Sequence, residues 1–452
     1  MPVRFADLAG RRVAVWGYGR EGRAALGALR QRLPGLAVTL WCRPDEADPA
    51  RAAYPHAHIV AQAPVAADLA AFDWVIKSPG ISAYRPEIDA ARSAGTRFTS
   101  GTALWFGARA DARVAAVTGT KGKSTTSALL AHLARAAGWR TALAGNIGLP
   151  LLDLLDGDAA LWVIELSSFQ TGEAGPVELA LITNLFEEHL DWHGTVERYR
   201  SDKLRLADVA RTLLVNAGQP VLLQATAAHP QRHVFGDTGG WHVRDDALWR
   251  AGRRVLERAL LPLPGLHNAH NACAALAAFE RLGGDALEVA PALARFRGLP
   301  HRLQRLGERE GLLWVDDSIS TTPEATRAAL QSLAGRPAGL ILGGHDRGLD
   351  WTDFARWLAV HAPACTIAQG AGAARIAAAL QAQGLAPLRA PDLEAAVALA
   401  RRHTPAGGAV LLSPGAPSFD QFRDYADRGR AFARLAGFDP AQMDEIAGLG
   451  LG

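Results

Sequence analysis

The chain has 452 residues, nearly half of them hydrophobic, and a mean hydropathy of +0.02, which is the composition of a globular protein long enough for several cores. Its 48 basic and 45 acidic residues are interleaved and leave a formal charge of +3, which argues against a basic surface for nucleic acid or membrane. No apolar run reaches the ~18 residues of a membrane span and no leader pattern begins the chain, so we expect a cytoplasmic protein.

Two residue types are unusually sparse. The three cysteines lie far apart in the sequence, which argues against both a disulfide framework and a zinc site. Only four of the 48 basic residues are lysines, namely Lys77, Lys121, Lys123 and Lys203. Arginine cannot replace a lysine whose compact ammonium fits between phosphates or whose neutral amine must react. Lys123 and Lys203 are therefore candidate functional residues, whereas chance survival explains Lys77 and Lys121 equally well.

Short runs of Val, Ile and Leu alternate with alanine-rich helical stretches in three successive blocks, the pattern of parallel α/β units. The expected strands lie at 12–16, 38–41 and 74–76 in the first block, at 113–118, 161–166, 179–185 and 212–216 in the second, and at 312–315, 339–342, 365–368 and 409–412 in the third. The sequence predicts an α/β fold of three domains: a Rossmann-like N-terminal domain at 1–100, a central parallel sheet of the P-loop ATPase type at 101–298, and a Rossmann-like C-terminal domain at 299–452.

A glycine-rich loop follows the first expected strand. Its residues Gly17, Tyr18, Gly19, Arg20, Glu21 and Gly22 formally match the dinucleotide fingerprint, which makes an NAD(P)-dependent oxidoreductase one hypothesis. That reading needs an acidic residue at the end of the second strand, where the chain has Trp41, Cys42 and Arg43. The loop could serve any diphosphate, or be a glycine turn without a ligand.

The strongest local signal is a second glycine-rich loop between an expected strand and an expected helix, made of Gly119, Thr120, Lys121, Gly122, Lys123, Ser124 and Thr125. In such a loop the backbone N–H groups and the helix N-terminus hold phosphates, the lysine reaches the terminal phosphates, and the hydroxyl after it holds Mg²⁺. The first glycine of the common pattern would fall at Val117, so this is a variant loop. It predicts ATP binding over the bland alternative of a glycine-rich turn.

Polar residues follow two further strands of the second block. Glu165 ends one strand, and Glu187, Glu188 and His189 follow the next. Because the carboxyl ends of parallel strands meet at one edge of a sheet, these side chains are expected to face the phosphate loop. A carboxylate there is a plausible Mg²⁺ ligand. Each group taken alone would more often be a solvated charge.

The sequence resembles the Mur ligase family of peptidoglycan synthesis along essentially its whole length, and within it the MurD type. The motifs that carry the resemblance are TGTKGKST at 118–125, GNIG at 145–148, ELSSFQ at 165–170, EHLD at 188–191, KLR at 203–205, HN at 267–268, GLPHR at 298–302, DS at 317–318 and LSP at 412–414. The resemblance implies an ATP-dependent ligase that joins UDP-N-acetylmuramoyl-L-alanine to glutamate through an acyl phosphate, with two Mg²⁺ sites.

Site residues follow by resemblance. It implies catalytic roles for Lys123, Glu165, His189 and Lys203, with Ser124, Glu165, His189 and a carbamylated Lys203 as metal ligands. ATP would be held by 119–125 together with Asn268, Asn271, Arg302 and Asp317. The UDP-sugar would contact Gly17, Tyr18, Gly19, Arg20, Ser78, Pro79, Gly80, Asn146, Ser167 and His189. The implied glutamate-binding residues are Thr321, Arg347, Ser418 and Tyr425.

Departures from the family pattern concern both substrates. Trp41 and Cys42 stand where many relatives present Asp-Thr to uracil. Ile319 stands where many have a lysine, so the glutamate pocket is altered. We therefore slightly favour L-glutamate over the usual D-glutamate. A monomer is expected, and a non-catalytic nucleotide-binding protein remains the third hypothesis beside the ligase and the oxidoreductase.

Overall fold

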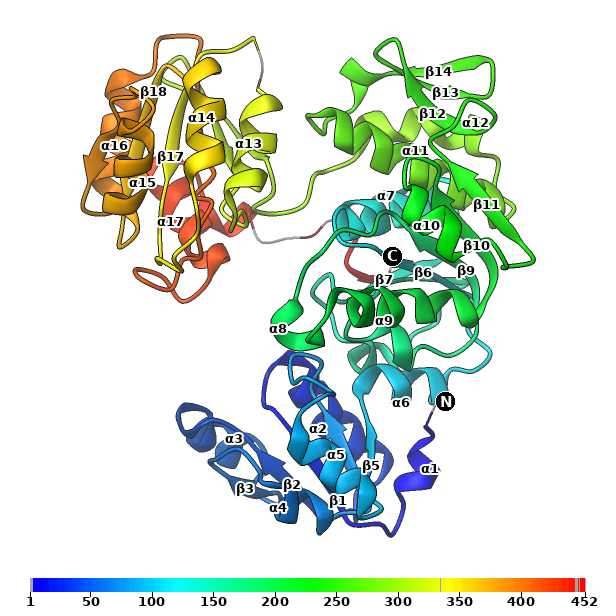
Figure 1. Cartoon of the computed structure of the whole chain (residues 1–452). Helices are drawn as coiled ribbons and strands as arrows, with labels where there is room; N and C mark the ends of the chain where they lie inside the picture. Colours follow the sequence, from blue (N-terminus) through cyan, green and yellow to red (C-terminus); the bar gives the residue numbers. More distant parts are fainter. Residues whose placement is uncertain (1–2, 334, 444–445, 447, 452) are drawn as a thin grey trace. The chain divides into compact units, whose positions relative to one another are not determined.

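The computed structural model describes residues 3–333, 335–443, 446 and 448–451. These residues form two compact units, one made of the chain up to 260 together with 270–294 and 448–451, the other made of 261–269 together with 295–443 and 446. The first unit contains two parallel α/β sheets and a small antiparallel sheet, and the second unit contains one further α/β sheet (Figure 1). The predicted α/β architecture is confirmed, whereas the predicted domain boundaries stay a prediction.

The N-terminal sheet has five parallel strands in the order β3-β2-β1-β4-β5. The strands are β1 (Val13–Trp16), β2 (Val38–Trp41), β3 (His58–Val60), β4 (Trp74–Lys77) and β5 (Arg97–Thr99). The sequence missed β3 and β5, because three-residue edge strands are too short to show a period. The helices of this part are α1 (Phe5–Leu8), α2 (Arg20–Arg32), α3 (Ala47–Ala53), α4 (Ala66–Ala70) and α5 (Pro86–Ser93), with the 3₁₀ turn η1 (Pro44–Glu46).

The central sheet has seven strands in the order β11-β10-β9-β6-β8-β7-β21, and all its strand pairs are parallel except the last. The strands are β6 (Val114–Thr118), β7 (Thr141–Gly145), β8 (Leu161–Glu165), β9 (Val177–Ile182), β10 (Ala210–Asn216), β11 (Arg232–Phe235) and β21 (Gly450–Leu451). The carboxyl ends of β6, β8 and β9 therefore meet at one edge, as the polar residues after them had indicated.

Helices and short elements surround the central sheet. They are α6 (Gly101–Ala108), α7 (Lys123–Ala136), η2 (Leu151–Leu154), η3 (Thr171–Glu173), α8 (Leu190–His193), α9 (Val196–Asp208), α10 (Pro220–Ala225), η4 (Arg258–Leu260), α12 (Ala286–Val289) and η5 (Ala290–Arg295). Helix α11 (Leu266–Arg281) has residues in both units. The antiparallel sheet consists of β12 (Trp241–Arg244), β13 (Ala247–Arg250) and β14 (Arg253–Glu257).

The sheet of the second unit has six strands in the order β15-β16-β20-β17-β18-β19. Only β15 is antiparallel to its neighbour among these described strands. The strands are β15 (Gln304–Arg309), β16 (Leu312–Asp316), β17 (Ala338–Leu342), β18 (Cys365–Gln369), β19 (Leu388–Ala390) and β20 (Ala409–Leu412). The helices are α13 (Pro323–Gln331), α14 (Thr352–Val360), α15 (Ala373–Gln381), α16 (Leu393–His403), α17 (Tyr425–Leu435) and the turn η6 (Pro440–Gln442).

The end of the chain does not belong to the sheet of the second unit. Strand β21 pairs antiparallel with β7 of the central sheet, with Gly450 opposite Leu143. The guanidinium of Arg135 donates to the carbonyl oxygen of Gly450 over 3.0 Å and also to that of Gly448. The last described residues therefore form an edge strand of the central sheet. The sequence did not predict this strand, because two apolar residues among glycines are too short a pattern.

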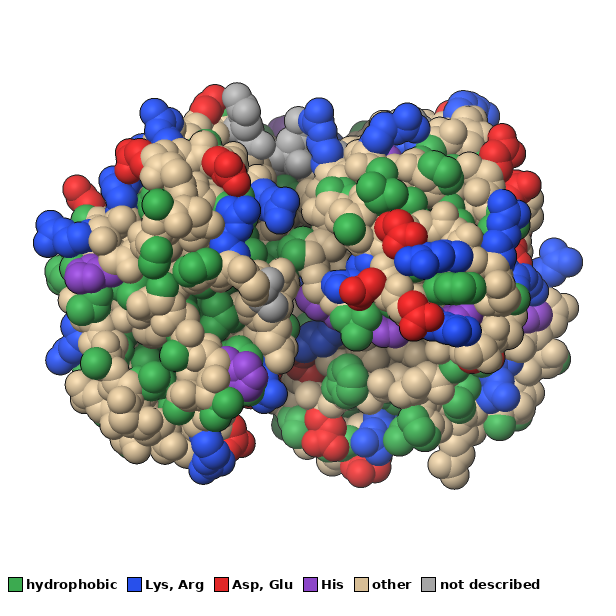
Figure 2. Space-filling view, turned by 90° about the horizontal axis from the view of Figure 1, so that it is seen from above, with side chains coloured by type: hydrophobic (Ala, Val, Ile, Leu, Met, Phe, Trp, Pro, Cys, Tyr) green, Lys and Arg blue, Asp and Glu red, His purple; other side chains and the backbone are tan. Residues whose placement is uncertain are grey.

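The surface carries charges of both signs. Acidic side chains lie among basic ones on the face shown in Figure 2, which agrees with the small net charge of the chain. Within the described residues, no helix combines the length and the apolar character that crossing a membrane would require.

Candidate functional site

The loop between β6 and α7 has the backbone of a phosphate cradle. Gly119 has φ +145° and Gly122, which precedes the first residue of α7, has φ +83°. A Cβ on Gly119 would lie 2.0 Å from Oγ1 of Thr183, and one on Gly122 would lie 2.5 Å from Oδ1 of Asn271. Both positions therefore require glycine. Val117, where the common pattern has its first glycine, is still a buried residue of β6, so this loop turns two residues later.

Two side chains after β9 hold this loop. Oδ1 of Asn184 accepts from the N–H groups of Thr120 and Lys121 over 3.1 and 2.8 Å, and its Nδ2 donates to the carbonyl oxygen of Lys121 over 2.9 Å. The hydroxyl of Thr183 donates to the same oxygen over 2.7 Å. Sequence reasoning missed both residues, because an asparagine after a strand is an ordinary turn residue unless its partners are known.

The lysines of the loop contact protein groups. Nζ of Lys123 donates to the carbonyl oxygen of Thr120 over 3.0 Å, and Lys121 forms an ion pair with Glu188. The hydroxyl groups of Thr120 and Tyr199 are 2.6 Å apart, which joins the loop to α9. Lys123 therefore already lies at the cradle, where an incoming triphosphate would exchange a carbonyl contact for a stronger contact with an anion.

A buried carboxylate stands beside the cradle. Glu165 ends β8 with no exposed surface, and its Oε1 accepts from Nδ2 of Asn146 over 2.6 Å. Its other oxygen, Oε2, is buried without a hydrogen-bond partner among the described residues. A buried oxygen without a donor is costly unless a cation meets it, so the donor set fits Mg²⁺.

The side chains near the cradle also indicate how a metal ion would be bound here. No three His, Cys, Asp or Glu side chains in the described part of the chain gather as a metal cluster. Mg²⁺ here would instead rely on Glu165, the hydroxyl of Ser124 and oxygens of the nucleotide, which is the usual arrangement for this ion at phosphate sites.

Lys203 lies in α9 with 2% exposure, and its Nζ donates to the carbonyl oxygen of Gly119 over 2.9 Å. Its ammonium also lies 5.1 Å from the ring centre of Tyr199. Burial lowers the pKa of Lys203 well below its usual value, and the nearby charge of Lys123 lowers it further, against the opposing effect of Glu188 and Glu165. An amine in this position is neutral far more readily than a surface lysine.

His189 lies directly before α8 with φ +56°, a left-handed conformation that is uncommon for a residue other than glycine. Partial burial lowers the pKa of its imidazole, opposed by Glu188 and assisted by Lys123. Its ring centre lies 5.1 Å from that of Phe169. The neutral form, which can ligate a cation, is favoured at this position.

A buried polar network that the sequence did not reveal lies behind His189 and Lys203. Nδ1 of His193 is 2.7 Å from Oδ2 of Asp202, and its Nε2 is 3.0 Å from Oγ of Ser168. The hydroxyl of Tyr84 donates to both oxygens of Asp202. Since Asp202 precedes Lys203 in α9 and His193 ends α8, the network fixes the two helices against each other. In the sequence these residues are single polar groups, and only the fold brings them together.

The residues predicted to hold the UDP-sugar surround one cavity of about 670 Å³ at the carboxyl ends of β1, β2 and β4. The cavity is also lined by Trp41 and Cys42, where the resemblance places the uracil contact. Two predicted residues, Ser167 and His189, do not line the cavity. The hydroxyl of Ser167 nevertheless donates to Oε1 of Gln170, and Gln170 is a lining residue. Of the predicted residues, the lining contains Gly17, Tyr18, Gly19, Arg20, Ser78, Pro79, Gly80 and Asn146.

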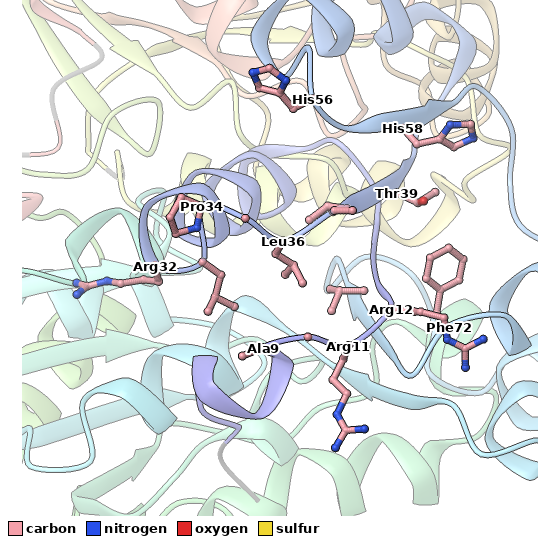
Figure 3. A pocket seen from close by; sticks show the side chains of 16 residues that line it. Ala9, Arg11, Arg12, Arg32, Pro34, Leu36, Thr39, His56, His58 and Phe72 are labelled. Atoms are coloured by element: carbon pink, nitrogen blue, oxygen red, sulfur yellow. The ribbon is translucent and has the colours of Figure 1, made fainter.

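A second cavity, of about 650 Å³, lies at the opposite, amino ends of β1 and β2 (Figure 3). Leu36 and Val13 are among its lining residues, and the charged ends of Arg11 and Arg32 point away from its centre. It contains none of the predicted site residues. Ligands of open α/β sheets bind at the carboxyl ends of the strands, so the first cavity is the better candidate.

In the second unit, Asp317 follows β16 and is buried. Its Oδ2 accepts from the hydroxyl groups of Ser413, over 2.7 Å, and Ser320. Burial raises the pKa of Asp317 to about 6, although these hydrogen bonds and the charge of Arg302 oppose the rise. Nε of Arg302 is buried without a hydrogen-bond partner among the described residues.

The candidates for glutamate binding differ in exposure. Ser418 is buried, Thr321 is half-buried, and Arg347 and Tyr425 are exposed. Sequence reasoning missed Arg428, which is 1% exposed and donates through Nη2 to the carbonyl oxygens of Ser318 and Ala416 over 2.8 and 2.9 Å. It thereby joins the two segments that lead to Thr321 and Ser418. The roles of all these residues stay predictions.

A phosphate cradle between a strand and a helix, with a buried carboxylate on the neighbouring strand, defines a nucleotide-binding α/β protein. Residues 117–279 match the family model of the Mur ligase middle domain, and residues 301–415 match that of the Mur ligase glutamate ligase domain. The chain belongs to the Mur ligase family, whose members are ATP-dependent amide ligases that use Mg²⁺. The family and enzyme class predicted from the sequence are therefore confirmed.

Two similar enzymes align with nearly the whole chain. The UDP-N-acetylmuramoyl-L-alanine–L-glutamate ligase of Xanthomonas euvesicatoria is 51% identical over 99% of this chain and all of its own length. The enzyme of the same name from Salinispora tropica is 41% identical over 96% of this chain and 98% of its own.

Solved structures agree on the fold. The UDP-N-acetylmuramate-alanine ligase MurC from Thermotoga maritima superposes with a TM-score of 0.62 at 22% identity, covering 94% of this chain and 99% of that one. MurF from Acinetobacter baumannii gives a TM-score of 0.57 at 20% identity, covering 74% of this chain and 85% of that one. At these identities the likeness concerns the fold alone.

Proposed function

We propose that this protein joins L-glutamate to UDP-N-acetylmuramoyl-L-alanine at the expense of ATP. The observation that carries the proposal is the 51% identity to a ligase of that name across 99% of the chain. The phosphate cradle, the buried Glu165 and the cavity lined by the first glycine-rich loop support it, because such a cradle suits ATP, such a carboxylate suits a cation, and such a loop suits the diphosphate of a sugar nucleotide.

The chemistry has two steps. A carboxylate oxygen of the L-alanyl group attacks the γ-phosphorus of ATP, which forms an acyl phosphate and releases ADP. The amine of glutamate then attacks the acyl carbon, phosphate leaves with the electrons of the broken C–O bond, and the amine loses a proton. Lys123 and the N–H groups of the cradle stabilise the negative charge of the transferred phosphoryl group.

Two Mg²⁺ ions fit this reaction, since they neutralise phosphate oxygens. Ser124 and Glu165 would hold one, and His189 and Lys203 would serve the second. For Lys203 this requires that its neutral amine attacks CO₂, forming an N–C bond and losing a proton, so that the side chain ends in an anionic carbamate. The lowered pKa of Lys203 supports this modification because it makes the neutral amine easier to reach, and the contact with Gly119 supports it because it holds that amine beside the cradle.

The remaining assignments follow the same proposal. The cavity of the N-terminal sheet would take the UDP-sugar, and Asn268, Asn271, Arg302 and Asp317 would complete the nucleotide site. Thr321, Arg347, Ser418 and Tyr425 would bind glutamate. We further propose three domains at 1–100, 101–298 and 299–452, and a cytoplasmic monomer. Membership of the ligase family leaves nothing in favour of the oxidoreductase hypothesis.

L-Glutamate is preferred over D-glutamate for two reasons. The similar enzymes are named as L-glutamate ligases, and Ile319 stands where many relatives have a lysine, which alters the predicted glutamate pocket. The test offers each enantiomer separately to the purified enzyme with ATP and UDP-N-acetylmuramoyl-L-alanine, and follows the product by mass. We expect product with L-glutamate. Exclusive use of D-glutamate would refute the proposed preference for L-glutamate. Phosphate release that requires neither UDP-N-acetylmuramoyl-L-alanine nor glutamate would refute the proposed ligase activity.

A further inference from the structure

Lys77, one of the four lysines, has no role in the function proposed so far. It ends β4 with 3% exposure, and its Nζ donates to the carbonyl oxygens of Ile81 and Ser78 over 2.8 and 3.3 Å. These carbonyls belong to the turn 78–81, every residue of which lines the cavity of the N-terminal sheet. The buried ammonium therefore holds that turn without itself lining the cavity.

The same turn is joined to α8 of the central part through Trp192. Nε1 of Trp192 donates to the carbonyl oxygen of Pro79 over 3.0 Å, and the hydroxyl of Ser82 donates to the carbonyl oxygen of Trp192 over 2.6 Å. The ammonium of Lys77 lies 5.6 Å from the ring centre of Trp192, within the range of a cation–π contact. Three different contacts thus connect residues 77–82, the turn and its two flanking residues, with Trp192 of α8.

Helix α8 is in turn part of the catalytic region. It begins directly after His189 and ends at His193, which contacts Asp202, the residue before Lys203. The ring of Trp192 stacks on Phe169 with 4.6 Å between ring centres, and Phe169 also lines the UDP-sugar cavity. The turn 78–81 is therefore held against a helix that is itself fixed by contacts within the central part.

We propose that Lys77 is a positioning residue for the diphosphate of the UDP-sugar. It fixes the turn 78–81 and holds that turn against Trp192, so that the turn can bind the diphosphate. The inference rests on the function proposed above only for the identity of the sugar. A lysine suits the place because its compact ammonium donates to two carbonyls while facing a ring, whereas a guanidinium is planar, bulkier and donates in a fixed fork. This explains why lysine persists here in a chain that otherwise uses arginine.

The test compares Lys77→Met with Arg97→Met. Arg97 also places its cation over a tryptophan of the same sheet, 5.4 Å from the ring centre of Trp74, but it is exposed and absent from the cavity lining. Loss of two charge-assisted hydrogen bonds should raise the KM for the UDP-sugar roughly tenfold or more in Lys77→Met. The KM values for ATP and glutamate and the kcat should stay within about twofold, and Arg97→Met should match the wild type.

Direct binding of UDP, measured by calorimetry on the wild type and both variants, separates this inference from the proposed reaction. We expect the Kd for UDP to rise about tenfold in Lys77→Met, whether or not turnover is seen with the full substrates. Trp192→Phe, which keeps the ring but loses the N–H donated to Pro79, should raise it by roughly threefold and serves if Lys77→Met does not fold. Unchanged UDP binding in either variant, or an equal rise of all three KM values, would overturn the proposal.

Discussion

Asn184 offers the sharpest test of the ATP cradle. Replacing it by alanine removes three hydrogen bonds, two from the N–H groups of Thr120 and Lys121 and one to the carbonyl oxygen of Lys121. Each such bond stabilises by about 1 kcal/mol, and because Asn184 is half-buried, water recovers part of the loss, which leaves about 1.5–3 kcal/mol. If the cradle must be held in place to bind phosphates, the affinity for ATP falls by roughly 10- to 150-fold, at about 1.4 kcal/mol for each factor of ten.

The assay measures the KM for ATP from phosphate release and the Kd for ADP by calorimetry. The matched control is Asn216→Ala at the end of the neighbouring strand β10, where the side chain donates to the carbonyl oxygen of Thr183 and accepts from Gly218 without contacting the cradle. The control should leave both constants within about twofold. An unchanged KM and Kd in Asn184→Ala, or an equal change in the control, would show that the asparagine does not organise the loop.

Two further predictions follow from buried ionisable groups. Lys203→Ala should lower kcat by roughly a thousandfold or more, since charge stabilisation carries most of the catalysis, and a small added carboxylic acid should restore part of the phosphate release; full activity without it would contradict the carbamate. Burial, with the nearby Asp153, raises the pKa of Glu21 from its usual 4.5 to about 7, so the folded state holds this proton more tightly and stability falls as the pH rises between these values. At 1.36 kcal/mol per pH unit the total loss across these two values is roughly 3.4 kcal/mol. Glu21→Gln should therefore be more stable than the wild type at pH 8 but not at pH 4.5 in urea unfolding, and equal unfolding curves would refute the shift.

Membership of the ligase family also changes how the first glycine-rich loop is understood. The residues 17–22 formally match a dinucleotide fingerprint, yet 17–21 line a cavity together with Ser78, Pro79 and Asn146. A loop of this kind binds a diphosphate through backbone N–H groups, and these groups do not distinguish one nucleotide from another. What surrounds the loop, here Trp41 and Cys42 instead of an acidic residue, decides which nucleotide fits.

The amino-acid sequence was sufficient for the three-block α/β pattern, for the glycine-rich loop at 119–125 between a strand and a helix, and for Glu165 at the end of a strand, because each rests on local order along the chain. The burial of Glu165 was not predicted. The rarity of lysine also singled out Lys203 before its burial was known. These features are recognisable in sequence since strand and loop chemistry act over a few consecutive residues.

Only the tertiary structure revealed what holds these elements together. Asn184 supports the ATP loop from another strand, Arg428 joins two loops of the second unit, and Lys77 and Trp192 meet across 115 positions of sequence. Such contacts leave no local pattern, because a single polar residue looks the same whether it faces water or a distant carbonyl. Their effect comes from burial and geometry, which exist only once the chain has folded.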